Sequence, residues 1–308
     1  MNLKVSCSPH LRSPVNTPWV MIQVIVALLP ATCAAIILFK HRAALLIANC
    51  VITALITEEV IQKIRKKSST ITDYSAALTG LLLALILPPS TRWYAASLGS
   101  IFAIAVGKHL FGGLGANIFN PALVARAFLM AAYPKMLTTF IEPFGVDAVT
   151  KATPLALRKF SGLITPTKDL FFGTIPGSLG ETSAICLIIG GAYLLWRKIA
   201  DWRIPLAILA TTIVVSASFH IINPLNGSIL FHLFSGGLLL GAFFMATDPV
   251  TTPTTKMGRY IFGIGCGALI MVIRYFSGLP EGTMYSILFM NALTPLINNY
   301  TQPKRFGA

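Results

Sequence analysis

Residues 19–39, WVMIQVIVALLPATCAAIILF, contain no aspartate, glutamate, lysine or arginine. A helix needs about 20 mostly apolar residues to cross the hydrocarbon core of a bilayer, and this stretch is long enough to do so. Pro30 lies inside the stretch and prolines also break the region before it, which disfavours a cleaved signal peptide. We therefore predict that the stretch is a retained membrane span.

The rest of the chain is similarly apolar. Of its 308 residues 55% are hydrophobic and only 11% are charged, with a mean hydropathy of +0.75, whereas a soluble domain carries about a quarter charged residues. We predict an all-α polytopic membrane protein with about ten transmembrane segments. The other nine segments are 45–61, 76–87, 95–106, 122–133, 183–196, 204–222, 229–245, 260–276 and 283–297.

Two of these segments, 76–87 and 122–133, are too short to cross a bilayer as single helices. At 1.5 Å per residue, a dozen residues cover about 18 Å of a core that is about 30 Å thick. They either extend into their polar flanks or are half-length, broken helices. Backbone groups freed at a break must face protein, water or a cofactor.

The two halves of the chain resemble each other. Residues 79–84, TGLLLA, match residues 235–240, SGGLLL, and Phe111-Gly112-Gly113-Leu114 has a counterpart in Phe276-Ser277-Gly278-Leu279. Because each half holds five segments, an odd number, the second half enters the membrane from the opposite side. This pattern predicts two inverted five-segment repeats, an arrangement found in many transporters.

The net charge of +14 is explained by membrane topology and not by nucleic-acid binding. With the N-terminus in the cytoplasm, fourteen lysines and arginines fall in cytoplasmic segments and four in short outer loops. We therefore predict a cytoplasmic arm (1–18), a first membrane repeat (19–133), an extracytoplasmic loop (134–182), a second membrane repeat (183–300) and a cytoplasmic tail (301–308).

The predicted loop 134–182 is the one long hydrophilic segment, and it contains Asp147-Ala148-Val149-Thr150-Lys151-Ala152-Thr153-Pro154. A threonine hydroxyl is a poor nucleophile at neutral pH, so a modifying enzyme would have to recognise this peptide and act on it. The alternative is purely structural, with Thr153 as the N-cap of a helix and Pro154 as its first residue.

Few other residues could carry chemistry. Four acids, Glu58, Asp73, Glu181 and Asp248, lie near segment ends where we expect water to reach them; each is a candidate for an ion path or a cap. The five cysteines and five histidines show no metal-ligand spacing, and we expect no metal site. The sequence has no phosphate-binding Walker loop and no serine-protease-like triad, so we predict no catalytic residues.

A glycine-rich link, residues 107–117 (GKHLFGGLGAN), joins the segments 95–106 and 122–133. Glycine lets a backbone approach a flat ligand closely. A tight turn between two helices explains the link equally well.

Several motifs together resemble one known family. Asp147–Thr153 resembles a flavinylation motif, Asp-x-x-Ser/Thr-Gly/Ser-Ala-Thr, and residues 108–122, 177–183, 246–251 and 73–80 resemble other signatures of the same proteins. These proteins are the RnfD component of the Rnf (Rsx) ion-translocating oxidoreductase complex and its relative NqrB, a component of the sodium-translocating NADH:quinone reductase. The resemblance runs from about Trp19 to the C-terminus.

This resemblance implies FMN bound covalently to Thr153, with Asp147, Thr150 and Ala152 recognised by a flavin transferase. Lys151 departs from the motif, which has glycine or serine there; its cation would slow attachment or pair with the flavin phosphate. A second flavin, riboflavin, would lie among the helices beside Gly112, Gly113 and Asn117. The partners would be the other subunits of the complex and the lipid bilayer.

The resemblance also implies a function and a location. The chain would sit in the bacterial cytoplasmic (inner) membrane as part of a redox-driven translocase, carrying electrons and coupling their transfer to cation movement. Residues alone leave two alternatives open. One is a secondary transporter for a small solute or ion without a redox role, and the other is a structural subunit that anchors partners.

Overall fold

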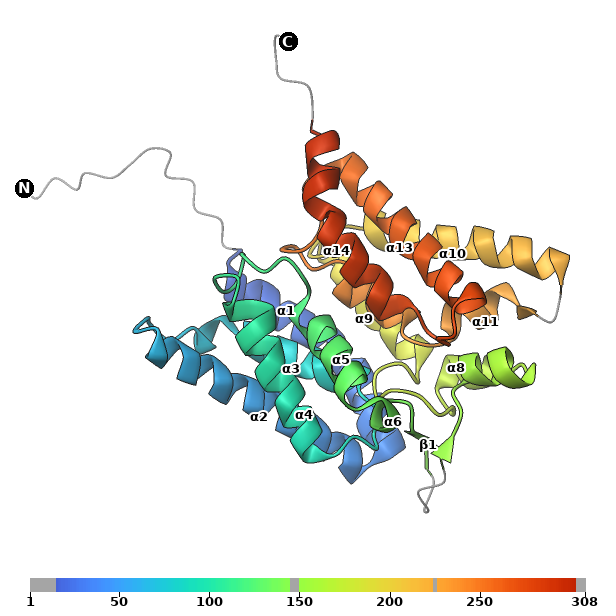
Figure 1. The fold of residues 1–308 in the computed structure, drawn as a ribbon, viewed down its shortest axis with the longest axis horizontal. Helices are drawn as coiled ribbons and strands as arrows, with labels where there is room; N and C mark the ends of the chain where they lie inside the picture. The colour runs from blue at the N-terminus through green and yellow to red at the C-terminus, as the bar shows by residue number, and fades with distance from the viewer. Residues whose placement is uncertain (1–14, 145–149, 224–225, 303–308) are drawn as a thin grey trace, which may run out of the picture.

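The computed structural model describes residues 15–144, 150–223 and 226–302, and these form a helical protein in two halves (Figure 1). Asp147 and both chain ends lie outside the described residues. The first half consists of α1 (Thr17–Phe39), α2 (His41–Ile64), a 3₁₀ turn η1 (Ile71–Asp73), α3 (Ser75–Ile86), α4 (Trp93–Phe102), the π-helical η2 (Ala103–His109) and α5 (Pro121–Ala132).

Residues 133–183 connect the two halves, and we call them the connecting segment. Its described residues form short elements only. They are α6 (Pro134–Leu137), the strands β1 (Phe140–Ile141) and β2 (Thr150–Lys151), α7 (Pro154–Ala156), η3 (Leu157–Ser161) and α8 (Thr167–Phe172). The strands pair antiparallel, with Phe140 opposite Lys151. This small hairpin, which the sequence did not predict, is the one departure from an all-helical fold within the described residues.

The second half consists of α9 (Ala184–Trp196), α10 (Arg203–Ile222), α11 (Ile229–Phe234), α12 (Leu238–Leu240), the π-helical η5 (Gly241–Met245), α13 (Lys256–Phe276) and α14 (Thr283–Tyr300). Each of the ten predicted segments therefore contains helix, and the polytopic all-α fold is confirmed. Four helices, α1, α2, α10 and α13, are long and apolar enough to cross a membrane.

The apolar segment 229–245 is a broken helix. The chain breaks after α11, where the Ser235 backbone is extended and Gly236 adopts φ +66°, and it becomes helical again at Leu238. A residue with a side chain rarely adopts such a positive φ, and glycine adopts it at little cost. The break places Gly236 and Gly237 inside the protein, at the junction of the two halves.

The short third helix is explained by its position. Eleven of the twelve residues of α3 are buried, and α3 contacts α1, α2, α4 and α5. Carbonyl groups at its C-terminal end are satisfied by the connecting segment, because the backbone N–H of Leu179 donates to the Leu87 oxygen (3.1 Å) and that of Gly180 to the Leu85 oxygen (2.7 Å). The predicted half-length helix therefore ends against protein, as a break at membrane depth requires.

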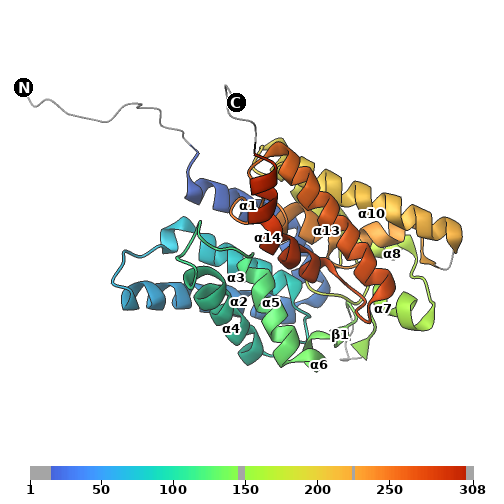
Figure 2. The same ribbon diagram turned by 45° about the horizontal axis from the view of Figure 1, so that its top comes forward.

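The two halves share one apolar core. Helix α1 packs against α9, the first helix of the other half, and α5 contacts α14, the last helix of the other half. The halves therefore pack against each other at both their first and their last helices. The start of α1 and the end of α14 lie on one side of the molecule and the β1–β2 hairpin on the opposite side (Figures 1 and 2).

Candidate functional site

Thr153 occupies the N-cap position of a short helical run formed by α7 and η3. Its backbone is extended (φ −65°, ψ 155°), its Oγ1 accepts a hydrogen bond from the Ala156 backbone N–H (3.3 Å), and Pro154 is the first helical residue. The N-cap geometry predicted for Thr153 as a structural alternative is thus confirmed. Attachment of a group to the hydroxyl is still compatible with this position, because Thr153 is only half-buried and is one of the residues that line a cavity.

This cavity, which we call the threonine cavity, lies between the connecting segment and both halves of the protein. Its lining includes Thr138, Thr153, Arg126, Glu181, Gly236 and Glu281. Arg126 comes from α5 in the first half, and Glu281 precedes α14 in the second. The connecting segment therefore places Thr153 at a cavity that is also lined by charged side chains.

The charged wall is a buried ion network. Arg126 donates from Nη1 to Glu181 Oε1 (3.1 Å) and from Nη2 to Glu281 Oε2 (3.4 Å). Glu281 also accepts from the Thr283 hydroxyl (3.3 Å) and from the Gly237 backbone N–H. A buried charge is tolerated when it is paired and hydrogen-bonded, and each of these three has such a partner.

The rest of the flavinylation-like motif is arranged around the hairpin. Thr150 and Lys151 form β2, and Ala152 is exposed. The Lys151 ammonium pairs with the Glu142 carboxylate (2.7 Å), with both side chains about half exposed. The charge of Lys151, the residue that departs from the flavinylation motif, is thus compensated by Glu142 on the other side of the hairpin.

Beyond Thr153, two basic residues of η3 hold the segment on the second half. The Lys159 ammonium donates to the carbonyls of Ile273 (3.3 Å), Arg274 (3.1 Å) and Leu279 (2.8 Å), at and just beyond the C-terminus of α13. The Arg158 guanidinium lies over the Tyr275 ring, 4.7 Å from its centroid. A cation at a helix C-terminus is stabilised by the carbonyl groups that lack partners there.

A second cavity lies between the halves, formed by the first turns of α1 and α3, the glycine-rich link, and the segment after η5. We call it the junction cavity. Its polar lining includes Lys108, Asn117, Asn120, Thr247 and Asp248, and its apolar lining includes Leu78, Leu82 and Phe244. The Asn117 Oδ1 atom is buried and without a hydrogen-bond partner among the described residues.

The glycines of the link turn the chain and do not line the junction cavity. Gly112 and Gly113 adopt φ +125° and +111°, values that favour glycine. The cavity is lined by Lys108, Leu114 and Asn117 from this link, but by neither Gly112 nor Gly113. Of the three residues expected beside a second flavin, only Asn117 therefore lines this cavity.

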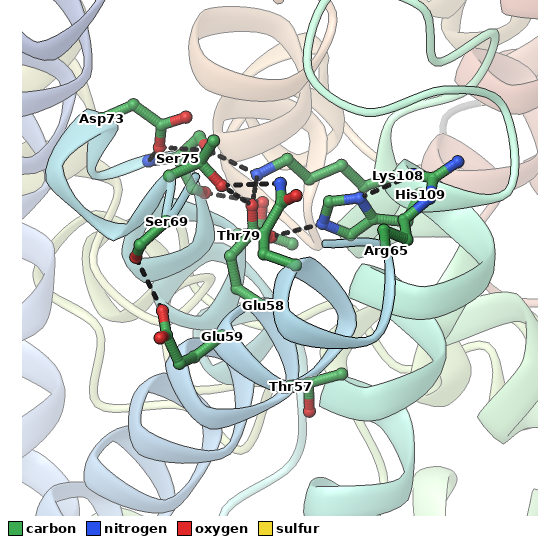
Figure 3. A network of polar contacts seen from close by, with 12 residues as sticks. Thr57, Glu58, Glu59, Arg65, Ser69, Asp73, Ser75, Thr79, Lys108 and His109 are labelled. Carbon is green, nitrogen blue, oxygen red and sulfur yellow. Dashed lines mark hydrogen bonds and ion pairs between the residues drawn. The ribbon is translucent and has the colours of Figure 1, made fainter. Parts of the chain in front are cut away.

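Glu58 lies at the centre of a polar cluster in the C-terminal part of α2 (Figure 3). Its Oε1 accepts from the Lys108 ammonium (2.9 Å) and its Oε2 contacts His109 Nε2 (2.9 Å), while Lys108 also donates to the Ser75 hydroxyl (2.7 Å). Glu58 is completely buried, so the expectation that water reaches it is wrong in this chain.

The tautomer of His109 follows from its other neighbour. Arg65 Nη1 lies 3.4 Å from His109 Nδ1, and a guanidinium has donors but no acceptor. Nδ1 must therefore accept, which leaves the Nε2–H to donate to the Glu58 carboxylate. A neutral His109 and a charged Lys108 together satisfy Glu58, and Lys108 links this cluster to the junction cavity.

The structure separates the four acids expected on an ion path. Asp73 accepts from the Ser75 backbone N–H (2.8 Å) as a cap beside the Glu58 cluster. Asp248 lines the junction cavity, and Glu181 lines the threonine cavity. Glu58, Asp73 and Asp248 therefore gather around Lys108 and the junction cavity, whereas Glu181 belongs to the other site.

Sequence reasoning missed Arg126, Glu281 and Lys108. A signal existed for Arg126, since a charged residue inside the apolar stretch 122–133 is costly at membrane depth and is retained for a partner. No such signal identified Glu281, which follows Pro280 in an ordinary-looking loop. Within the described residues, no group of three or more histidine, cysteine, aspartate or glutamate side chains is placed to hold a metal ion.

Comparison with known proteins matches the NQR2, RnfD, RnfE family over residues 4–307. The Na(+)-translocating ferredoxin:NAD(+) oxidoreductase complex of Acetobacterium woodii contains a subunit, designated D, that is 47% identical, covering 100% of this chain and 96% of its own length. Its counterpart in the proton-translocating ferredoxin:NAD(+) oxidoreductase complex of Clostridium ljungdahlii is 45% identical, over 98% of this chain and 96% of its own.

A more distant relative has the same span. The corresponding subunit of the ion-translocating oxidoreductase complex of Halorhodospira halophila is 36% identical over 97% of this chain and 94% of its own length. The family resemblance read from the motifs is confirmed: the chain belongs to the NQR2, RnfD, RnfE family.

Proposed function

We propose that this chain is the membrane subunit of an ion-translocating electron-transport complex and that it carries electrons through an FMN joined to Thr153. The relatives support the first part, because their names all describe subunits of oxidoreductase complexes that translocate ions. They favour this function over a secondary transporter without a redox role. Other subunits of such a complex and the lipid bilayer would be its partners.

The observation that carries the second part is the position of Thr153 at the threonine cavity. Thr153 lines this chamber, and it stands at the N-terminus of the helical run of α7 and η3, where backbone N–H groups stabilise negative charge such as a phosphate. A bound FMN supplies the redox centre, and the protein supplies position and electrostatics. Lys159 and Arg158 fix the segment that bears it.

Mass spectrometry of the chymotryptic peptide that spans Thr153 tests this proposal. The protein must be produced together with its own flavin transferase and the rest of its complex. Formation of the phosphoester joins the threonine Oγ1 to phosphorus and releases one water, so the peptide is expected to be heavier by FMN less one water. Recovery of only the unmodified peptide from active complex would overturn the proposal.

We further propose a second, non-covalent flavin in the junction cavity. The unpartnered Asn117 Oδ1, the Lys108 ammonium and the apolar side chains of Leu82 and Phe244 suit a flat heterocycle with a polar edge. Replacing Asn117→Leu is expected to lower the flavin released by denaturation without altering the covalently bound flavin. Equal release from both proteins would contradict this assignment.

For cation coupling we propose that Glu58, which pairs with Lys108, and Asp248, which lines the junction cavity together with Lys108, form part of the ion path. Asp248→Asn is expected to reduce ion transport per electron severely while the covalent flavin content stays near normal, because Asp248 is remote from the threonine cavity. Transport into proteoliposomes and gel fluorescence measure the two quantities. Glu59→Gln is the control, since Glu59 pairs with Lys63 at the surface; equal loss of transport and flavin in Asp248→Asn would exclude an ion-path role.

A further inference from the structure

Three charged groups from different parts of the chain meet at the wall of the threonine cavity, and their charges do not balance. Arg126 contributes one positive charge, and Glu181 and Glu281 contribute two negative charges. Glu181 is buried and Glu281 is largely so. A second cation, Arg274, is close enough for its charge to act on both carboxylates. Its guanidinium donates to the carbonyls of His232 (2.6 Å) and Ser235 (2.8 Å), and within the described residues it forms no ion pair with either glutamate.

The two carboxylates are close to each other. A Cβ added to Gly237 would lie 2.7 Å from Glu281 Oε1 and 2.9 Å from Glu181 Oε1, so these two oxygens are less than about 6 Å apart. Only glycine leaves room for both. Gly236 and Gly237, which follow Ser235, thus leave space beside the backbone for a pair of acids, and Gly236 also lines the cavity.

A buried hydroxyl without a partner lies beside this pair. Ser178 is fully buried, and its Oγ forms no hydrogen bond of ordinary geometry with the described residues, although it is close enough to Glu181 to influence that carboxyl group. Burial and the Glu281 carboxylate raise the pKa of Glu181, and Arg126 only partly opposes this. Two like charges sharing one site favour retention of a proton.

We propose that Glu181 and Glu281 share a single proton-binding site, and that this site takes up one proton when the cofactor at Thr153 is reduced. The electron comes from a donor subunit of the complex and adds one negative charge to the cavity. The proton comes from water on the side of the hairpin and ends on a carboxylate oxygen. The total charge of the cavity is therefore unchanged, and no bond to the cofactor is made or broken.

This inference rests on the proposed flavin at Thr153 and assigns to its pocket a means of charge compensation. Among the charged residues at the cavity, Arg126 and Arg274 keep the positive charge of their guanidinium groups. The shared carboxylates are thus the groups that can change charge when an electron arrives.

Infrared difference spectra of the purified, flavin-loaded complex test the inference. Reduction at mildly alkaline pH is expected to produce the carbonyl stretching band of a protonated carboxylic acid, which shifts in heavy water. The band is expected to be absent from Glu181→Gln and from Glu281→Gln. In each variant Arg126 keeps one carboxylate partner, and the charges of this remaining ion pair cancel. Both variants are therefore expected to fold. Asp169→Asn, which alters an acid of α8 that does not line the cavity, should keep the band.

Persistence of the band in both glutamine variants, or its absence from flavin-loaded wild-type complex, would overturn the inference. A Thr153→Ala protein separates this failure from failure of the proposed function. Without a flavin there, reduction is expected to leave the carboxyl pair unchanged, but a pH titration should still reveal the same band and lose it in Thr153→Ala combined with Glu181→Gln. A titration without that band would exclude the proton site itself.

Discussion

Replacing Thr153→Ala is expected to remove covalent flavin from this chain completely while leaving the protein folded. The hydroxyl is the atom to which the phosphate would be joined, so no partial product can form without it. The structural loss is small in comparison: the side chain is half-buried, and removing an N-cap costs about 1 kcal/mol. A denaturing gel viewed under ultraviolet light measures the result directly, since a covalent flavin fluoresces in the protein band.

The matched control is Thr138→Ala. Thr138 also lines the threonine cavity, and its hydroxyl donates only to the Pro134 carbonyl (2.9 Å) and the Lys135 carbonyl (3.3 Å). This variant should retain the fluorescent band. A Thr153→Ala band as bright as the wild-type band would show that the flavin, if present, is attached elsewhere.

Replacing Arg126→Leu is expected to lower the free energy of unfolding by about 3–5 kcal/mol, the usual loss when one partner of a buried ion network is removed. Leucine fills much of the space but leaves Glu181 and Glu281 facing each other without a cation. Thermal unfolding of the purified complex in detergent would report the loss, and poor accumulation in the membrane would accompany it.

Two comparisons separate this electrostatic cause from lost packing. Adding Glu181→Gln and Glu281→Gln to Arg126→Leu is expected to restore most of the stability, because the uncompensated charges are then gone. Arg92→Leu, at an exposed position before α4, should change the free energy of unfolding by less than about 0.5 kcal/mol. A stable Arg126→Leu protein would show that the network contributes nothing to folding.

Hydrophobicity was enough to predict most of the fold. Each of the ten apolar segments is helical, because unpaired backbone groups cannot be tolerated in a membrane. The break at Gly236 was missed since apolarity continues through it from Phe231 to Met245. A serine followed by two glycines marks the break locally. Its significance depends on the two carboxylates that occupy the space beside Gly237, and these lie far away in the sequence.

The candidate site was predicted in part. Thr153 was found from its motif, and Asn117 from the glycine-rich link, because both lie in continuous stretches of distinctive sequence. The Arg126 network could not be found in this way. Its members are 55 and 155 positions apart along the chain, and only the packing of α5 against the second half brings them together.

The attachment of Lys159 to the end of α13 has a mechanical consequence. The ammonium grips three carbonyl oxygens at the end of a helix that is long enough to cross the membrane, and only five residues separate Lys159 from Thr153. If that helix slid or tilted, Thr153 and any group joined to it would move with the helix. Displacement of α13 and movement of the proposed electron carrier would then occur together.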